Sequence, residues 1–475
     1  MKQSWIIAIA LAFVAACLCG LLAALAIGGA AFFGWITTSS ISEATPEPSA
    51  IPETSAHPTK TPMPTSDPLA SATTAVSMSD EIEAQMDEIQ EQVIALRGLR
   101  LSDPVDRDLL SEAALRQRVT DDFLADYSPE EAQQDARTLS LFGMLAPDFD
   151  LMDLYLELYS EQVAGYYDSE AEQMFVVANE AFGGIERLTY SHEFTHVLQD
   201  QTYDMEQGLG MTEDACELDS ERCAAITAVL EGDATMAEEQ WLRTYATADD
   251  LEEIMDFYAA FESPVFDSAP QFLQEDFIFP YTFGTRFVRQ AYADQGWASV
   301  DALYDNPPLS TEQILHPERY PRDVPLILDL PDLGATLGGG WQEIDAGVWG
   351  EWFTRLMLAE RIDEKTAETA AAGWGGDRDL AYFNETLGQG ALILFSAWDR
   401  PLDATEFSDA FEAYALERFG EGELERGFGT WETGTEFVRF EHAAGQTLWI
   451  LAPDAETGAL IRDAIKFPIP LEQDE

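Results

Sequence analysis

Basic side chains are scarce in this sequence of 475 residues. The chain has 25 Lys and Arg residues against 88 Asp and Glu residues, which gives a formal net charge of −63. Only four of the basic residues are lysines (Lys2, Lys60, Lys365 and Lys466). Such a chain repels polyanions, so nucleic acid is excluded as an expected partner, and anionic lipid headgroups are disfavoured for the same reason. We expect a surface covered largely by carboxylates.

Cysteine is also rare, and its four residues form two close pairs. Cys17 and Cys19 lie in an apolar run, whereas Cys216 and Cys223 lie in a polar, acidic segment. In an oxidising compartment the second pair could close a small disulfide loop. Two free thiols or a metal-binding pair are the alternatives, but the spacing is not the usual one for a zinc knuckle.

The N-terminal region has no charge at all from Gln3 to Ser42, and Trp5 to Ile36 is apolar. A bilayer core needs about 20 apolar residues, so residues 1–36 are predicted to form a single-pass membrane anchor. Lys2 precedes the run, which favours an extracytoplasmic body. A cleaved signal peptide and a lipoprotein signal ending at Cys17 are the alternatives, and each of them also exports the body.

The following segment, residues 37–78, is rich in Pro, Ser and Thr and has few large apolar residues. It is predicted to be a semi-extended spacer that holds the folded part away from the membrane. In contrast, 46% of the whole chain is hydrophobic and 11% is aromatic, enough for large cores in two or three domains.

Two of only five histidines lie four residues apart in His192-Glu193-Phe194-Thr195-His196. The apolar spacing predicts a helix from Ile185 to about Asp200, on which His192 and His196 share one face and can reach one metal ion. Glu193 is rotated by about 100° and can reach a metal-bound water instead. This arrangement is typical of metal-assisted hydrolysis.

A catalytic zinc site needs a third protein ligand, for which the candidates are Glu231, Asp233, His316 and His442. Glu231 is the preferred one, because it lies in the middle of a second predicted helix, Cys223 to about Arg243, among apolar residues. A carboxylate in such a place is costly unless it meets a cation.

The two segments together resemble the gluzincin group of zinc metallopeptidases, the thermolysin-like clan. The resemblance rests on the His192–His196 motif followed by Glu231-Gly232-Asp233-Ala234 and covers roughly residues 161–243. It implies that His192, His196 and Glu231 bind Zn²⁺, that Glu193 is the general base, and that a small sheet lies beside the two helices. Thr235 stands where the thermolysin pattern would have an aspartate, which leaves Asp233 open as a partner of the site or as the ligand itself.

Amide hydrolysis also needs a group that stabilises the developing oxyanion. His316 and Tyr281 are the candidates, with a packing or capping histidine and a core tyrosine as the alternative interpretations. Upstream of the motif, Val163–Tyr167 and Met174–Val177 are predicted to form a strand hairpin. Its exposed edge could take a peptide as an added strand, or the hairpin could be purely structural.

The predicted fold class is α+β and predominantly helical, with a gluzincin-like core and a C-terminal α+β lobe. Ala391–Trp398 and Gln446–Leu451 are predicted strands of that lobe, Ala404–Phe419 a helix, and residues 373–378 a turn. The predicted segments are an anchor (1–36), a linker (37–78), a helical lobe (79–160), the metallopeptidase-like core (161–345) and the C-terminal lobe (346–475).

The sequence therefore predicts a membrane-anchored, extracytoplasmic zinc peptidase that acts on a peptide or protein substrate. Two alternatives remain, a catalytically inactive metalloprotease-like binding or scaffold protein at the cell surface, and a metal hydrolase acting on a non-peptide amide. The sequence does not indicate an oligomeric state.

Overall fold

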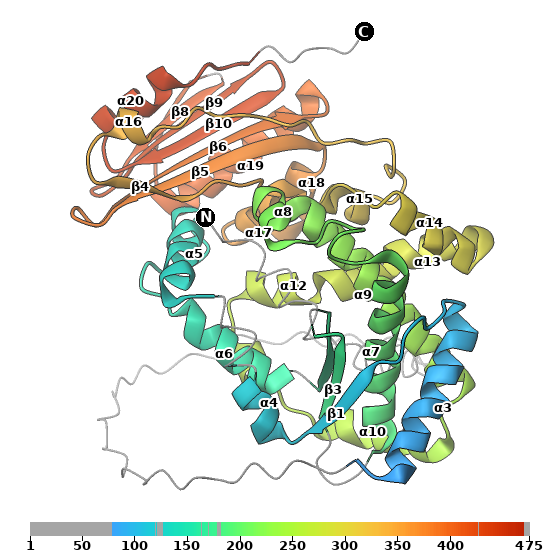
Figure 1. The fold of residues 1–475 in the computed structure, drawn as a ribbon. Helices are drawn as coiled ribbons and strands as arrows, with labels where there is room; N and C mark the ends of the chain where they lie inside the picture. The colour runs from blue at the N-terminus through green and yellow to red at the C-terminus, as the bar shows by residue number, and fades with distance from the viewer. Residues whose placement is uncertain are drawn as a thin grey trace, which may run out of the picture.

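The computed structural model describes residues 78–469, apart from residues 119, 121–126, 163, 170, 178–181 and 426. The predicted anchor and all but the last residue of the predicted linker lie outside the described residues. Within the described part, no helix is both long enough and apolar enough to span a membrane. The fold class is α+β, with many helices and one large antiparallel sheet (Figure 1).

The helical body comes first in the chain, and its elements are α3 (Asp80–Arg97), β1 (Asp106–Leu110), α4 (Glu112–Arg118), α5 (Pro129–Leu141), α6 (Leu151–Gln162), β2 (Gly165–Asp168), β3 (Gln173–Val177), α7 (Gly184–Tyr203), α8 (Glu213–Leu218), α9 (Ser220–Thr244), α10 (Ala248–Ala260), α11 (Pro264–Ser268), α12 (Gln271–Phe279), η2 (Pro280–Gly284), α13 (Thr285–Gln295), α14 (Trp297–Asp305) and α15 (Thr311–Leu315). The C-terminal lobe follows with α16 (Gly334–Leu337), β4 (Trp341–Asp345), α17 (Gly350–Ala359), α18 (Glu364–Ala371), β5 (Trp374–Asn384), β6 (Gln389–Trp398), α19 (Pro401–Phe419), β7 (Glu423–Glu425), β8 (Phe428–Glu432), β9 (Phe437–Ala443), β10 (Gln446–Ala452) and α20 (Ala455–Ala464).

Two helices, α7 and α9, lie side by side at the centre of the body (Figure 1). The α7 helix is buried on all sides from Leu188 to Gln199, and α9 is buried from Ala225 to Glu238. Their starts are fixed locally, because the Glu186 side chain accepts the Gly183 N–H at 2.9 Å and Asp219 accepts the Arg222 N–H at 3.0 Å. Such caps satisfy backbone donors that a helix cannot pair itself.

A small sheet packs against α7, and it has three strands in the order β1-β3-β2. The predicted hairpin is found as β2 and β3, which pair antiparallel. The prediction for residues 79–160, successive helices, missed β1. This strand pairs parallel to β3, so its partner lies more than 60 residues away in the sequence.

The large sheet has seven antiparallel strands in the order β4-β5-β6-β10-β9-β8-β7. The α19 helix packs on one face, toward the helical body, while α16 and α20 pack on the other (Figure 1). The predicted strands and helix of this lobe correspond to β6, β10 and α19. The predicted turn at residues 373–378 is wrong, because most of it is the bulged start of β5. Since β4 already belongs to this sheet, the lobe begins before residue 346.

Of the three hydrophobic clusters among the described residues, the largest spans both parts of the molecule. Phe142, just after α5, is fully buried, and its ring stacks on Trp349 at 3.6 Å and meets Trp449 of β10 edge-on at 5.7 Å. The Tyr414 hydroxyl of α19 donates to the Phe142 carbonyl at 2.6 Å. The C-terminal lobe therefore rests directly on the body that carries the motif helix.

Candidate metal centre

Three side-chain atoms converge between α7 and α9. His192 Nε2 lies 3.2 Å from His196 Nε2 and 3.2 Å from Glu231 Oε2, and the distance from His196 Nε2 to Glu231 Oε2 is 3.5 Å. Ligands held at 2.0–2.1 Å in a tetrahedron around zinc are about 3.3 Å apart. The three atoms thus have the mutual spacing of three corners of a zinc site, and they form one of the candidate metal-binding groups in the described residues.

The protonation of both rings follows from their other nitrogen atoms. His192 Nδ1 lies 3.0 Å from the Glu238 carboxylate, to which it donates. His196 Nδ1 lies 2.8 Å from Gln199 Oε1. The orientation of the Gln199 amide is fixed, because its Nε2 donates to the Leu230 carbonyl at 3.0 Å. In their neutral forms both histidines therefore point the acceptor lone pair of Nε2 toward the Glu231 carboxylate.

Three acceptors that face one another without a donor repel one another unless a cation or protons lie between them. The second oxygen of Glu231, Oε1, is buried and has no hydrogen-bond partner among the described residues. Burial disfavours the charged forms of the site, but hydrogen bonds with Glu231 and Glu238 raise the pKa of His192 well above its usual value. Burial also opposes ionisation of Glu231, yet the two histidines lower its pKa. The site therefore favours positive charge at its centre, and its ligand set of two imidazoles and one carboxylate fits zinc.

Glu193 lies beside this group, and the Tyr167 N–H of β2 donates to its Oε2 at 3.1 Å. No other hydrogen bond to Glu193 is found among the described residues, which leaves Oε1 available for proton transfer. Burial raises the pKa of Glu193 to about 7, against the opposing effect of the two histidine rings. All four side chains are buried, and His196 is the most exposed of them at 7%.

Asp233 is not part of the ligand group, which corrects the alternative left open by the sequence. Its carboxylate accepts two hydrogen bonds from Arg97 of α3, at 2.7 and 3.0 Å, and one from the Tyr304 hydroxyl at 2.6 Å. Tyr304 in turn accepts from Gln199 Nε2 at 3.0 Å. A hydrogen-bond chain thus runs from His196 through Gln199 and Tyr304 to a buried ion pair, and it holds the ring in place.

His316 belongs to a different cluster. Its Nε2 lies 2.8 Å from Glu351 of α17, and it is not in the group with the other two histidines. This placement does not support the predicted oxyanion role. A second candidate metal-binding group, Glu312, Asp323 and Asp399, already surrounds the guanidinium of Arg319.

The other two candidates from the sequence have clear positions. Tyr281 is fully buried in the π-helical segment η2, which packs against α9. Its oxyanion role stays a prediction. His442 lies in β9 of the C-terminal sheet and pairs in register with Thr447 of β10, so it is not a ligand of this group.

Sequence reasoning missed Glu238, Gln199 and Arg97. Two of them carry a local signal. Glu238 lies seven residues after Glu231, two turns along the same face of α9, and Gln199 lies three residues after His196 on α7. Arg97 carries no such signal, because it reaches Asp233 from 136 residues away.

Comparison with known proteins reaches only the C-terminal lobe. A family model described as a domain of unknown function (DUF8575) matches residues 337–462. The match contains all seven strands of the large sheet and none of the residues of the candidate metal centre. No curated protein and no solved structure matches the chain.

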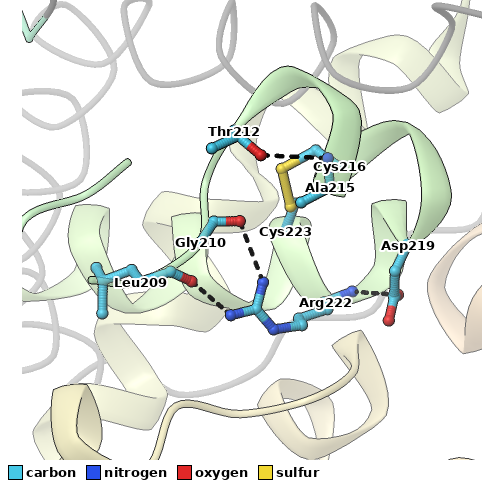
Figure 2. Close-up of a disulfide and its surroundings, with 8 residues drawn as sticks. All are labelled: Leu209, Gly210, Thr212, Ala215, Cys216, Asp219, Arg222 and Cys223. Atoms are coloured by element: carbon cyan, nitrogen blue, oxygen red, sulfur yellow. Dashed lines mark hydrogen bonds between the residues drawn. A yellow bond between two sulfur atoms is a disulfide. The ribbon is translucent and has the colours of Figure 1, made fainter. Parts of the chain in front are cut away.

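The predicted disulfide is present, between Cys216 of α8 and Cys223 in the first turns of α9. Arg222 lies next to it and donates to the carbonyls of Leu209 and Gly210, so the loop between α7 and α9 is tied to α9 at two points (Figure 2). This connection fixes the start of the helix that carries Glu231.

Proposed function

We propose that this protein is a gluzincin-like zinc peptidase. The observation that carries the proposal is the convergence of His192, His196 and Glu231 at the spacing of a tetrahedral site, with Glu193 beside them. Zinc held there would lower the pKa of a bound water toward neutrality and polarise the substrate carbonyl.

The side chains around the centre would then have separate roles in the reaction. Glu193 Oε1 takes the proton of the attacking water and gives it to the leaving amine, while the Tyr167 N–H holds Oε2. Glu238 and Gln199 keep both imidazole rings oriented with Nε2 toward the centre. Tyr281 is the candidate donor to the developing oxyanion.

The substrate class is a peptide or protein. In the three-stranded sheet β2 is an edge strand, and it is also the strand that contacts Glu193. A peptide bound next to β2 would lie beside the general base. The Cys216–Cys223 disulfide supports an extracytoplasmic body, and the apolar N-terminal segment supports attachment of the body to a membrane.

The test combines metal analysis with peptide hydrolysis in the full-length protein. We expect zinc near one equivalent in the wild type and in Glu193→Gln, and cleavage of a mixed peptide library that falls by about 10²- to 10⁴-fold in the variant. A second variant, His196→Ala, is expected to lose the metal as well.

Two results separate the alternatives. If the Glu193→Gln variant cleaves peptides at the rate of the wild type, Glu193 is not the general base. Bound zinc without hydrolysis of any peptide supports the inactive scaffold or, after a screen of non-peptide amides, a different amide substrate.

A further inference from the structure

A second candidate site lies where the helical body meets the C-terminal sheet. A cavity of about 110 Å³ opens there between α5, α9, α12 and the segment that joins β4 to α17. This volume holds several waters or the end of an amino-acid side chain.

The ionisable groups that line this cavity are all carboxyl groups. Among the described residues, five that line it carry a carboxyl group, namely Asp135, Glu221, Asp276, Asp345 and Asp379, and none that lines it is Lys, Arg or His. Glu221, Asp276 and Asp379 are at most 5% exposed. Buried carboxylates without a cation are costly, so the lining favours a positively charged occupant.

Two lining groups also lack a partner. Asp379 Oδ2 and the Trp349 indole N–H are both buried, and neither has a hydrogen-bond partner among the described residues. Two other lining carboxyl groups do have hydrogen-bond partners, because Thr311 donates to Glu221 at 2.9 Å and Trp352 Nε1 donates to Asp276 at 2.8 Å. When ionised, Asp379 is thus a buried acceptor that lines the cavity and lacks a donor. Burial and the neighbouring Asp345 raise the pKa of Asp379 well above its usual value, and a cation in the cavity would favour the ionised form.

The rest of the lining is aromatic and apolar, with Phe279, Trp349, Trp352 and Phe353 around the carboxylates. Aromatic faces attract cations and also accept methylene groups. Carboxylates and aromatic rings together are complementary to a cation on an apolar stem, and less so to a hydrated inorganic ion.

We propose that this cavity binds an alkylammonium or guanidinium group on a short apolar stem. Thr227 lines the cavity and lies one helical turn before Glu231 on α9, so a lysine or arginine side chain of a bound peptide is one source of this group. A free organic amine is the other. Burial raises the pKa of Asp276 to about 7 and that of Asp345 to about 6, and a bound cation would favour their ionised forms.

Binding can be measured by calorimetry on the full-length protein, without any hydrolysis. We expect agmatine and n-butylamine to bind, and the uncharged n-butanol not to bind. Asp379→Asn is expected to weaken agmatine binding by about tenfold or more, because asparagine has a similar shape but cannot carry the negative charge. Asp256→Asn, on the exposed face of α10, is the matched control and should bind as the wild type does.

A second variant covers the case in which Asp379→Asn does not fold. Gly347 lines the cavity, and a Cβ added there would lie 3.3 Å from Asp379 Oδ1, so Gly347→Ala fills space without changing charge. This variant should also weaken agmatine binding. Equal binding of n-butanol and n-butylamine, no binding of either amine, or wild-type affinity in these variants would overturn the proposal.

Competition identifies the source of the cation. The competitors are a lysine-containing peptide and the same peptide with norleucine in place of lysine. If only the lysine peptide displaces agmatine, the cavity binds a side chain of the substrate. Displacement by small amines alone assigns it to a free amine. Because these measurements require no cleavage, they stand whether or not the peptidase proposal holds.

Discussion

At the scale of single residues, Glu238 gives the sharpest test of how the metal centre is held. Its carboxylate orients His192 through the 3.0 Å contact with Nδ1. Glu238→Gln keeps an acceptor of similar shape but removes the charge, so zinc affinity is expected to fall by about 10- to 100-fold. Competition with a chromogenic chelator measures the change.

The neighbouring residue provides the control for this prediction. Glu239 pairs instead with Arg243 and Arg289 on the outer side of α9. Glu239→Gln should leave zinc affinity as it is in the wild type. Equal losses in both variants would mean that overall charge, and not the contact with His192, sets the affinity.

The residues of the centre differ in how far sequence could predict them. The spacing of His192 and His196 places both on one helix face, and the apolar turn around Glu231 indicates a carboxylate that needs a cation. His316 shows the limit of such reasoning. Its ring pairs with Glu351, 35 residues away, and nothing in the local sequence indicates that contact.

At the scale of elements, the crossing of α9 and η2 depends on two glycines. A Cβ at Gly232 would lie 2.4 Å from the Gly284 backbone, and one at Gly284 would lie 2.0 Å from the Ala228 carbonyl oxygen. Gly232 directly follows Glu231, so this close crossing fixes the position of the ligand. The crossing is incompatible with any side chain at either glycine.

Gly232→Ala should therefore push η2 away from α9. We expect a loss of about 1–3 kcal/mol in the free energy of unfolding in urea, together with weaker zinc binding. Gly339→Ala is the control, because no atom lies within 4 Å of a Cβ added there. Wild-type stability and zinc affinity in Gly232→Ala would show that the crossing is not as tight as described.

The long helices and the most apolar strands were predictable because their pattern is local. The apolar period predicts α7, α9 and α19, and continuous apolar runs predict β6 and β10. The missed elements have polar or non-local character. In β1 only Leu109 and Leu110 are apolar. The β5 strand carries the buried acids Asp377 and Asp379, and the first of them lies within residues 373–378, where a turn was predicted.

At the scale of the whole molecule, the acidic composition extends into the interior. Besides the cavity carboxylates, Asp377 is buried, where it accepts the backbone N–H groups of Trp349 and Gly350 at 2.7 and 3.0 Å. Burial raises the pKa of Asp377 to about 6. The chain therefore carries carboxyl groups that are easier to bury when they are protonated.

This property predicts the pH dependence of stability. Asp276 has a pKa of about 7 in the folded state, above its usual value, so near pH 5 the folded protein holds a proton that the unfolded chain has lost. The free energy of unfolding should consequently fall as pH rises from 5 to 7.5. Asp276 alone contributes about 2 kcal/mol to this fall.

Urea unfolding at pH 5 and 7.5, without added amines, measures the effect, and Asp276→Asn isolates one group. The asparagine keeps an acceptor for the Trp352 indole N–H but cannot ionise. The difference in the free energy of unfolding between pH 5 and pH 7.5 should therefore shrink by about 2 kcal/mol. Asp256→Asn, exposed on α10, should leave the difference unchanged. A free energy of unfolding that rises from pH 5 to 7.5 would contradict the argument, because it would mean that the unfolded chain binds more protons than the folded one in this range.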